Sequence, residues 1–412
     1  MNYDEVMNAL QARDLTMKRY ERQDWDRFVH RIGLSPSFPF VHIAGSNGKG
    51  STAYYLFNMY REKGYKVALF SKPFCQKENE MIRVNEREIS DADFARLYSL
   101  HEKEIEQCEL SRFEIETYIA FAYFNEQKPD IAIIECGMGG LTDSTNILSA
   151  KPLLSIITTI SLEHTAFLGV SLSEIAENKG GIIKNGVPVL VGKLPDEAMK
   201  KIRDIAKAHQ SELFLVDDYH FSHYEAPYFH FDYRPYHDLT LLTPASYQLS
   251  NATIAIETTK ILANRLPIDE FSVRKGLLKE PLPCRYEKHH NIILDGAHNP
   301  EAIRALMNTI SCSGLGKKIH VLFASLRDKN IAVELPIIAN VASDITLTTF
   351  PNPRAREEMD YFLFSEDYHF NPDYRAALNN LLAQYPDDLV LVTGSLAFAS
   401  IVREYVIDVL KL

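Results

Sequence analysis

The stretch HIAGSNGKGST, residues 42–52, joins an apolar strand-like run to a helix-like run through a glycine loop. This order is typical of a phosphate-binding unit in an α/β sheet, because the backbone N–H groups of the loop and the helix dipole point at a bound anion. The spacing differs from the ordinary GxxxxGK[ST] loop, since two residues and not four separate Gly45 from Gly48. We therefore predict a compressed nucleotide-phosphate loop, with Lys49 near the terminal phosphates, in preference to a plain glycine turn.

Apolar runs and helix-like segments alternate along the rest of the chain, which predicts an α/β fold. Strands are expected at 67–70, 130–135, 152–160 and 187–191, and later near 291–294, 318–323, 344–348 and 388–392. At 412 residues the chain exceeds the size of one core, so we predict two domains. Residues 1–282 are expected to form an N-terminal P-loop domain with a mostly parallel sheet flanked by helices. Residues 283–412 are expected to form a smaller, Rossmann-like α/β domain.

Charge and composition exclude several classes of function. The net charge is -11, and the sequence contains no Lys/Arg cluster of the kind that binds a nucleic-acid backbone. No apolar run approaches the roughly 18 residues of a membrane span, and the charged N-terminus lacks the apolar region of a signal peptide. The five cysteines are scattered and form no CxxC pair, which favours a reducing compartment. We expect a cytoplasmic protein that binds neither nucleic acid nor membrane.

Several polar residues are expected at the carboxyl edge of the first sheet. Glu135 ends the strand-like run IAIIE, where an acid can hold magnesium, although a strand can also end in Glu because it reaches solvent. The run ITTISLEHTAFLG brings Glu163 and His164 to the same edge, and His can bind metal or phosphate. Lys179, in ENKGGIIK, is flanked by glycines that allow close backbone approach. Taken alone, Lys179 is better explained as a surface lysine.

In the second domain NIILDGAHNPEAIRAL reads as strand, turn and helix. Asn299 is a suitable N-cap and Pro300 a suitable first helical residue. Asp295 and His298 are therefore expected on a strand-end loop. Asp295 could accept hydrogen bonds from ribose hydroxyls, and a capping or turn role is the alternative.

The segment at 219–238, YHFSHYEAPYFHFDYRPYHD, alternates aromatic and polar residues, which predicts a β-hairpin. Its four histidines, at 220, 223, 230 and 237, could suggest a metal site. We interpret them as residues of the hairpin faces, because no Cys or carboxylate partner stands at ligand spacing along the chain.

Taken together, these stretches resemble the Mur ligase superfamily, and most closely its folylpolyglutamate synthase/dihydrofolate synthase branch. The motifs that carry the resemblance occur in that family's order: HIAGSNGKGST, IECGMGGLTDSTN, ITTISLEHTAFLG, ENKGGIIKNGVPV, LDGAHNP and TGSLAFAS. They span about residues 40–400, and the ordered set is far more specific than any one of them. The compressed glycine loop is the loop of this family.

The resemblance implies an ATP-dependent amide ligase that adds L-glutamate to a folate and that could also use dihydropteroate. A substrate carboxylate would take the γ-phosphoryl group of ATP, and the amine of glutamate would displace phosphate from the acyl phosphate. All three species are anionic, so catalysis would consist mainly of positioning and of charge neutralisation by Lys49 and Mg²⁺. ATP would lie in the cleft between the two domains.

The family's functional residues are carried over by motif. Those implied to hold ATP are Asn47, Gly48, Lys49, Gly50, Ser51, Asn251, Arg285 and Asp295. Those implied to hold Mg²⁺ are Ser71, Glu135, His164 and Lys179. Lys179 matches the lysine that this family carbamylates, and His298 is expected near the acyl phosphate or the incoming glutamate. Those implied to line the acceptor site are Phe113, Glu114, Thr142, Asp143 and Ser144.

Departures from the family pattern concentrate where the acceptor is expected. The family's SPHL is SKPF here, residues 71–74, so a histidine is absent. The family's GGRLDATN is GGLTDSTN, with Leu141 in place of an arginine, and FFE appears as RFE at residues 112–114. Cys284 replaces a glycine before Arg285.

Two other functions remain open from the sequence. One is a Mur-type ligase for a carboxylate other than folate. The other is a P-loop nucleotide-binding protein, or a P-loop kinase, without ligase activity. Lys179, Arg285 and Asp295 argue against this second class, because a kinase core needs none of them. We expect a monomer.

Overall fold

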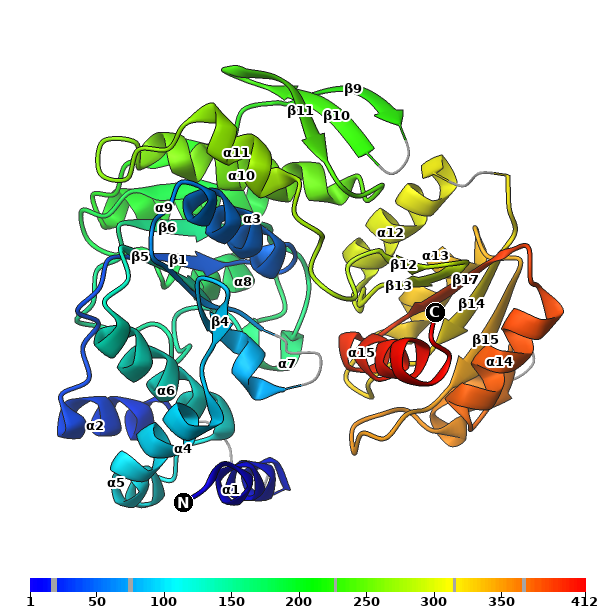
Figure 1. The fold of residues 1–412 in the computed structure, drawn as a ribbon, viewed down its shortest axis with the longest axis horizontal. Helices are drawn as coiled ribbons and strands as arrows, with labels where there is room; N and C mark the ends of the chain where they lie inside the picture. The colour runs from blue at the N-terminus through cyan, green and yellow to red at the C-terminus, as the bar shows by residue number, and fades with distance from the viewer. Residues whose placement is uncertain (16–20, 73–76, 226–227, 314–315, 365–367) are drawn as a thin grey trace. The chain divides into compact units, whose positions relative to one another are not determined.

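The computed structural model describes residues 1–15, 21–72, 77–225, 228–313, 316–364 and 368–412. The chain packs as two compact units (Figure 1). The first unit consists of residues 1–219, 233–236 and 250–279, and the second of residues 220–232, 237–249 and 280–412. The domain boundary after residue 282 is a sequence prediction, and Pro73 and Phe74 of the SKPF stretch lie outside the described residues.

The first unit is built on an eight-stranded sheet, within the described residues, in the order β4-β3-β2-β5-β1-β6-β7-β8. Its strands are β1 Phe40–Ala44, β2 Val67–Phe70, β3 Ile82–Val84, β4 Arg87–Glu88, β5 Ile131–Glu135, β6 Leu154–Ile157, β7 Val189–Val191 and β8 Leu213–Leu215. All neighbours from β2 to β8 pair parallel, and β3 and β4 add an antiparallel edge. The predicted mostly parallel sheet is confirmed.

The central strands are buried along their whole length, as expected for a parallel sheet covered on both faces. In the register, Ile43 of β1 lies opposite Glu135 of β5, and Phe70 of β2 lies opposite Ile134. The carboxyl ends of these strands therefore lie at the same edge of the sheet. The residues that follow them, which include the glycine loop, meet at one edge.

The first unit also contains helices, several of which cover this sheet (Figure 1). They are α1 Tyr3–Leu15, α2 Arg22–Ile32, α3 Lys49–Glu62, α4 Asp91–Leu100, α5 Glu102–Gln107, α6 Arg112–Gln127, α7 Thr165–Leu168, α8 Leu172–Gly180, α9 Asp196–Ala208, α11 Glu270–Leu277, most of α10 Tyr247–Ile261, and the 3₁₀ turn η1 Glu78–Met81. One core packs α1, α2, α4 and α6 against the sheet, with Trp25, Phe28 and Phe121 fully buried. A second core packs α8 and α9 against the strands from β6 to β7.

The second unit has a six-stranded sheet, within the described residues, in the order β12-β13-β17-β14-β15-β16. Its strands are β12 Glu287–His289, β13 Ile292–Leu294, β14 Ile319–Phe323, β15 Asp344–Thr348, β16 His369–Asn371 and β17 Leu389–Thr393, and its helical segments are α12 Pro300–Ser313, α13 Ile331–Ala339, η2 Glu358–Phe364, α14 Tyr374–Gln384, α15 Leu396–Glu404 and η3 Tyr405–Val409. The pairs from β13 to β16 are parallel, which confirms the second α/β domain.

The segment predicted as a hairpin forms a separate three-stranded sheet in the order β11-β10-β9. Its strands are β9 His220–Glu225, β10 Tyr228–Tyr233 and β11 Tyr236–Leu241. None of the helices in the described ranges combines the length and apolar character that crossing a bilayer requires.

Candidate active site

The glycine loop turns from β1 into α3, whose first residue is Lys49. Gly48 has a φ of 82°, in the left-handed region that favours glycine. A Cβ atom on Gly48 would come within 2.1 Å of Asn251 Oδ1, and one on Gly45 within 1.9 Å of Thr158 Oγ1. The loop therefore needs glycine at both positions. The Asn251 side chain lies directly against it, as expected for a residue that shares a nucleotide site.

Hydroxyl and backbone groups after β6 hold the loop in place. Thr158 Oγ1 donates to the carbonyl of Asn47 at 2.6 Å, and the Asn47 N–H donates to Thr159 Oγ1 at 2.9 Å. The Ser161 N–H donates to Ser46 Oγ at 2.9 Å. This support was not predicted from the sequence, although the polar run TTIS at the end of an apolar strand is a visible signal for it.

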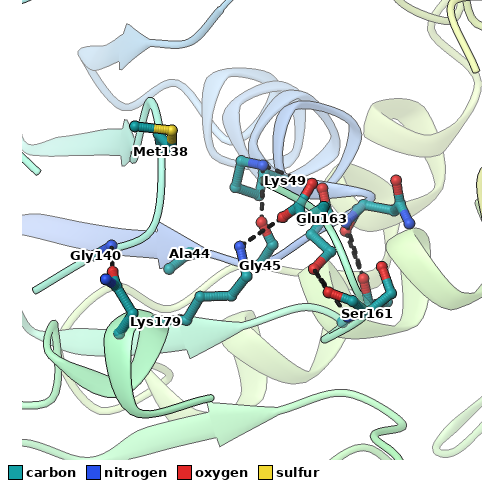
Figure 2. Close-up of polar contacts among 12 residues, drawn as sticks. Ala44, Gly45, Lys49, Met138, Gly140, Ser161, Glu163 and Lys179 are labelled. Carbon is teal, nitrogen blue, oxygen red and sulfur yellow. Dashed lines mark hydrogen bonds and ion pairs between the residues drawn. The ribbon is translucent and has the colours of Figure 1, made fainter. Parts of the chain in front are cut away.

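The Lys49 ammonium is turned back onto its own loop. Nζ donates to the carbonyl oxygens of Gly45, at 2.8 Å, and Ser46, at 3.3 Å (Figure 2). A phosphate oxygen at the start of α3 would compete with these carbonyls for the ammonium, and it would also meet the backbone N–H groups of the first helical turn. Gly50 and Ser51 lie in that turn, and both are buried.

A buried ion pair lies beside the loop. Lys179 Nζ, on α8, is 2.7 Å from Glu163 Oε1, and the two side chains point toward one another (Figure 2). Burial lowers the pKa of Lys179, and nearby Lys49 lowers it further, while Glu163 opposes both. Burial alone would raise the pKa of Glu163, but Lys179 and Lys49 outweigh it and hold the pKa at about 2. Glu163 is therefore an ionised carboxylate, and its negative charge offsets the positive charges of Lys179 and Lys49 at this edge of the sheet.

Glu135 and Ser71 meet at the first turn of α3. Ser71 Oγ donates to Glu135 Oε2, and the Lys72 N–H donates to the same oxygen at 3.2 Å. A Cβ on Gly50 would be 3.2 Å from Glu135 Oε2 and 3.4 Å from Ser71 Oγ, so both side chains lie close to the helix start. A carboxylate and a hydroxyl are hard oxygen ligands, and this donor set fits Mg²⁺. His164 stands next to Glu163 as the half-exposed residue that precedes α7.

The residues predicted to line the acceptor site have different environments. Asp143 is buried and accepts hydrogen bonds from the backbone N–H groups of Met138, at 2.8 Å, and Thr145, at 3.0 Å, while burial raises its pKa. Ser144 is also buried, with its hydroxyl 2.8 Å from Thr117 Oγ1. Asp143 and Ser144 hold the loop that follows β5. Thr142, beside them, is exposed.

Two further predicted acceptor residues lie at the start of α6. The Phe113 ring packs against Gly137 of the loop after β5, and Lys72 Nζ lies 4.3 Å from the ring centroid. Glu114 is buried and accepts from the N–H of Ser111 at 2.7 Å, which closes a capping box at the start of the helix. Lys72 was not predicted as a site residue, and its Nζ also lies 2.6 Å from Oε2 of buried Glu116.

The second unit gathers another set of predicted residues after β13. Asp295 is buried, and its Oδ2 accepts from Tyr247 Oη at 2.7 Å and from the Tyr286 N–H at 2.8 Å. Burial raises the pKa of Asp295, and Arg285 opposes the shift. His298 Nδ1 is 2.9 Å from the carbonyl of Gly296 in the same loop. Asp295 and His298 share this loop, and Arg285, which precedes β12, lies against it, because a Cβ atom on Gly296 would come within 2.9 Å of Arg285 Nη1.

Local capping behaves as the sequence predicted. Asn299 Oδ1 accepts from the Ala302 N–H at 2.9 Å, and α12 begins at Pro300.

Cys284, where the family has a glycine, has a φ of 56°, in the left-handed region. Its N–H donates to Glu287 Oε2 at 2.8 Å, which helps to fix a conformation that glycine would adopt without strain.

Comparison with known proteins decides the family. Residues 284–396 match the family model described as Mur ligase, glutamate ligase domain, and residues 43–259 match the Mur ligase middle domain. A folylpolyglutamate synthase of Lacticaseibacillus casei is 30% identical over 98% of this chain and 98% of its own length. A dihydrofolate synthase/folylpolyglutamate synthase of Bacillus subtilis is 33% identical, covering 88% of this chain and 89% of the relative. The chain belongs to the folylpolyglutamate synthase/dihydrofolate synthase family.

Solved structures agree with this assignment. The family member described here is similar to E. coli FolC in complex with DHPP and ADP, with a TM-score of 0.87, 26% identity and coverage of 100% of this chain and 99% of that chain. It is also similar to an FPGS-AMPPCP-folate complex, with a TM-score of 0.85, 28% identity and coverage of 98% and 100%. The resemblance drawn from six motifs is confirmed, as is the two-domain α/β fold class. The individual site residues of this folylpolyglutamate synthase/dihydrofolate synthase family member stay predictions.

Proposed function

We propose that this chain is an ATP-dependent ligase that joins L-glutamate to a folate acceptor. One observation carries the proposal. The compressed glycine loop, Glu135 and the buried Glu163–Lys179 pair lie at one edge of the sheet, in a chain similar over nearly its whole length to a folylpolyglutamate synthase. That edge offers cations, a helix N-terminus and hard oxygen ligands, which together suit a triphosphate.

The reaction has two steps. An oxygen of the folate carboxylate attacks the γ-phosphorus of ATP, the bond to the bridging oxygen breaks, and ADP leaves. The neutral amine of L-glutamate then attacks the acyl carbon and gives up one proton, and phosphate leaves with one of the original carboxylate oxygens. Each step brings anionic groups together, so the protein must mainly position them and offset their charge.

The first unit contributes the groups that hold the triphosphate. The backbone N–H groups at the start of α3, with Asn47, Gly48, Gly50 and Ser51, surround the phosphates, and the Lys49 ammonium moves from its loop carbonyls to a phosphate oxygen. A cation in a site shielded from water neutralises charge more effectively than one in bulk solvent.

Mg²⁺ is the metal that fits the oxygen ligands at this edge. Ser71, Glu135, His164 and Lys179 are the residues proposed to hold it. When bound, Mg²⁺ neutralises charge on the phosphate oxygens. A lysine ammonium repels a cation, and Mg²⁺ prefers oxygen ligands to an amine nitrogen. We therefore include carbamylation of Lys179, which supplies carboxylate oxygens, in the proposal. The lowered pKa of Lys179 supports this, because the neutral amine is the form that reacts with carbon dioxide.

The second unit contributes further proposed contacts. Arg285 and Asp295, together with Asn251 of the first unit, are assigned to the nucleotide, and His298 to the acyl phosphate or the incoming glutamate. Phe113, Glu114, Thr142, Asp143 and Ser144 are assigned to the folate. Use of dihydropteroate as a second acceptor belongs to the same proposal, as do a cytoplasmic location and a monomeric state.

The test is a product assay by mass spectrometry. The enzyme is incubated with ATP, Mg²⁺, L-glutamate and either tetrahydrofolate or dihydropteroate. The proposal expects a glutamylated product with tetrahydrofolate, and a product with dihydropteroate if the enzyme serves both reactions. Lys49→Ala should give no product. Lys63→Ala is the matched control at the other end of α3, where the lysine pairs with Asp269 on the surface, and it should keep activity. No product with either acceptor would refute the folate assignment.

A further inference from the structure

The outer face of the three-stranded sheet gathers histidines and carboxylates from neighbouring strands. In the antiparallel pair of β9 and β10, His223 lies directly opposite His230, and Glu225 lies opposite Tyr228. Side chains two residues apart on a strand share a face, so His223, Glu225 and His230 are on one side. The other face carries Phe229, Phe231 and Tyr233, which are buried, so the histidine face is the solvent face.

The three polar side chains come close enough to share an ion. Each of His223, Glu225 and His230 offers one ligand atom, and these atoms all lie within 4.8 Å of one another. The two imidazole rings are parallel, with centroids 4.4 Å apart. His223 and Glu225 are exposed and His230 is half-buried, so small rotations about their χ angles can bring the ligand atoms closer.

A second carboxylate orients one of the histidines. His230 Nδ1 is 3.0 Å from Asp238 Oδ1. An ionised carboxylate can only accept, so Nδ1 carries a proton, and in the neutral imidazole Nε2 keeps its lone pair for a metal. The Asp238 N–H in turn donates to Asp232 Oδ1 at 2.8 Å, which fixes the position of the orienting residue. Metal-binding histidines are commonly held by a carboxylate in this way.

We propose that His223, Glu225 and His230 bind one divalent transition-metal ion, of which Zn²⁺ is the best match, with Asp238 as the residue that positions His230. Two imidazole nitrogens and one carboxylate oxygen are a known zinc ligand set, which leaves a coordination position for water. Mg²⁺ and Ca²⁺ prefer ligand sets made of oxygen alone. The site uses none of the residues assigned to the ligase reaction. An ion bound by these three residues would link strand β9 to strand β10.

A metal site among these histidines was rejected from the sequence because no partner was found at ligand spacing along the chain. Glu225 and His230 stand on different strands, and only the cross-strand register brings them together.

The experiment is a zinc titration of the full chain. Chelator-treated enzyme is kept in excess Mg²⁺ and ADP, which occupy the catalytic site, and is titrated with Zn²⁺ against a chromophoric chelator. Wild type is expected to bind one Zn²⁺ more than the double variant His223→Ala/His230→Ala. Near-ultraviolet circular dichroism and retained ligase activity show that the double variant is folded.

Two single variants sharpen the test. Asp238→Asn keeps the size of the side chain and tolerates the φ of 49° at this position. It removes the carboxylate, and zinc affinity is expected to fall by about 10- to 100-fold. His237→Ala is the matched control, because that histidine is on the same sheet but is 79% exposed and contributes no ligand. It should bind zinc as wild type does.

Either of two results would overturn the proposal. One is equal zinc stoichiometry and affinity in wild type and in His223→Ala/His230→Ala. The other is a loss of zinc in His237→Ala as large as that in the double variant.

Discussion

The ammonium nitrogen of Lys179 lies 2.7 Å from a carboxylate oxygen of Glu163, and the two side chains are only 1% and 6% exposed. Removing one partner of a buried pair leaves the other charge without compensation. With Lys179 unmodified, Glu163→Gln is therefore expected to lower the free energy of unfolding by about 3 kcal/mol. Urea denaturation at neutral pH measures this directly.

The neighbouring surface pair is the matched control. Lys201 Nζ on α9 and Glu177 Oε2 on α8 are 3.1 Å apart, with side chains 31% and 61% exposed. Glu177→Gln should cost less than about 1 kcal/mol, because solvent screens an exposed pair. Equal losses in the two variants would show that Glu163–Lys179 is not the buried ion pair described here.

Lys179→Ala is expected to lower the rate of ADP formation by about 100-fold, the scale of losing one well-placed electrostatic group in an active site. If a carbamate on Lys179 helps to hold the metal, a small carboxylate can enter the space that the side chain leaves. Acetate or formate should then restore part of the activity. Lys201→Ala should keep full activity and show no response to acetate. Unchanged phosphate release in Lys179→Ala would remove Lys179 from the reaction.

The contact between Gly48 and Asn251 can be tested with a pair of glycines. Gly48→Ala places a Cβ atom 2.1 Å from Asn251 Oδ1, whereas Gly64→Ala, at a φ of 96°, meets nothing within 4 Å. Both variants carry the cost of a left-handed alanine, about 1 kcal/mol, but only Gly48→Ala also displaces the loop. We expect a raised KM for ATP in Gly48→Ala alone. A similar KM change in Gly64→Ala would contradict this explanation.

His42 makes the stability of the fold depend on pH. It is buried in β1, with Nε2 2.8 Å from Thr145 Oγ1, and burial lowers its pKa from 6.5 to about 3. Between these values the unfolded chain binds a proton that the folded chain does not, so the free energy of unfolding falls as the pH falls through this window. The slope from His42 reaches about 1.4 kcal/mol per pH unit and vanishes above the unfolded pKa.

Urea denaturation from pH 4 to pH 7 checks this contribution. The comparison concerns the slope, since His42→Gln also changes packing. The variant should show a shallower dependence on pH than wild type, and His369→Gln, at an exposed residue of β16, should match wild type. An unchanged slope in His42→Gln would assign the acid sensitivity to other groups.

The sequence predicted much of the fold because its strands are short, apolar and bounded by turns. The run at 67–70 is β2 to the residue, and the run at 130–135 contains β5. The antiparallel edge of β3 and β4 was not predicted, because two-residue and three-residue strands carry too little pattern to distinguish them from a loop.

At the site, the sequence identified residues but not their partners. Glu163 was noticed beside His164, yet its pairing with Lys179 depends on how α8 packs on the sheet. The hydroxyls of Thr158 and Thr159, which follow β6, support the glycine loop from more than a hundred positions away in the chain. Such contacts follow from tertiary packing, which spacing along the chain does not encode.

The fate of the acceptor's oxygen atoms tests the central claim most directly. The enzyme is incubated with ATP, Mg²⁺, L-glutamate and a folate labelled with ¹⁸O in the carboxylate that accepts glutamate. The ¹⁸O content of the released phosphate is then measured by mass spectrometry. Formation of an acyl phosphate predicts one labelled oxygen in each phosphate, together with a folate longer by one glutamyl unit. Glutamylated folate accompanied by unlabelled phosphate would contradict the account.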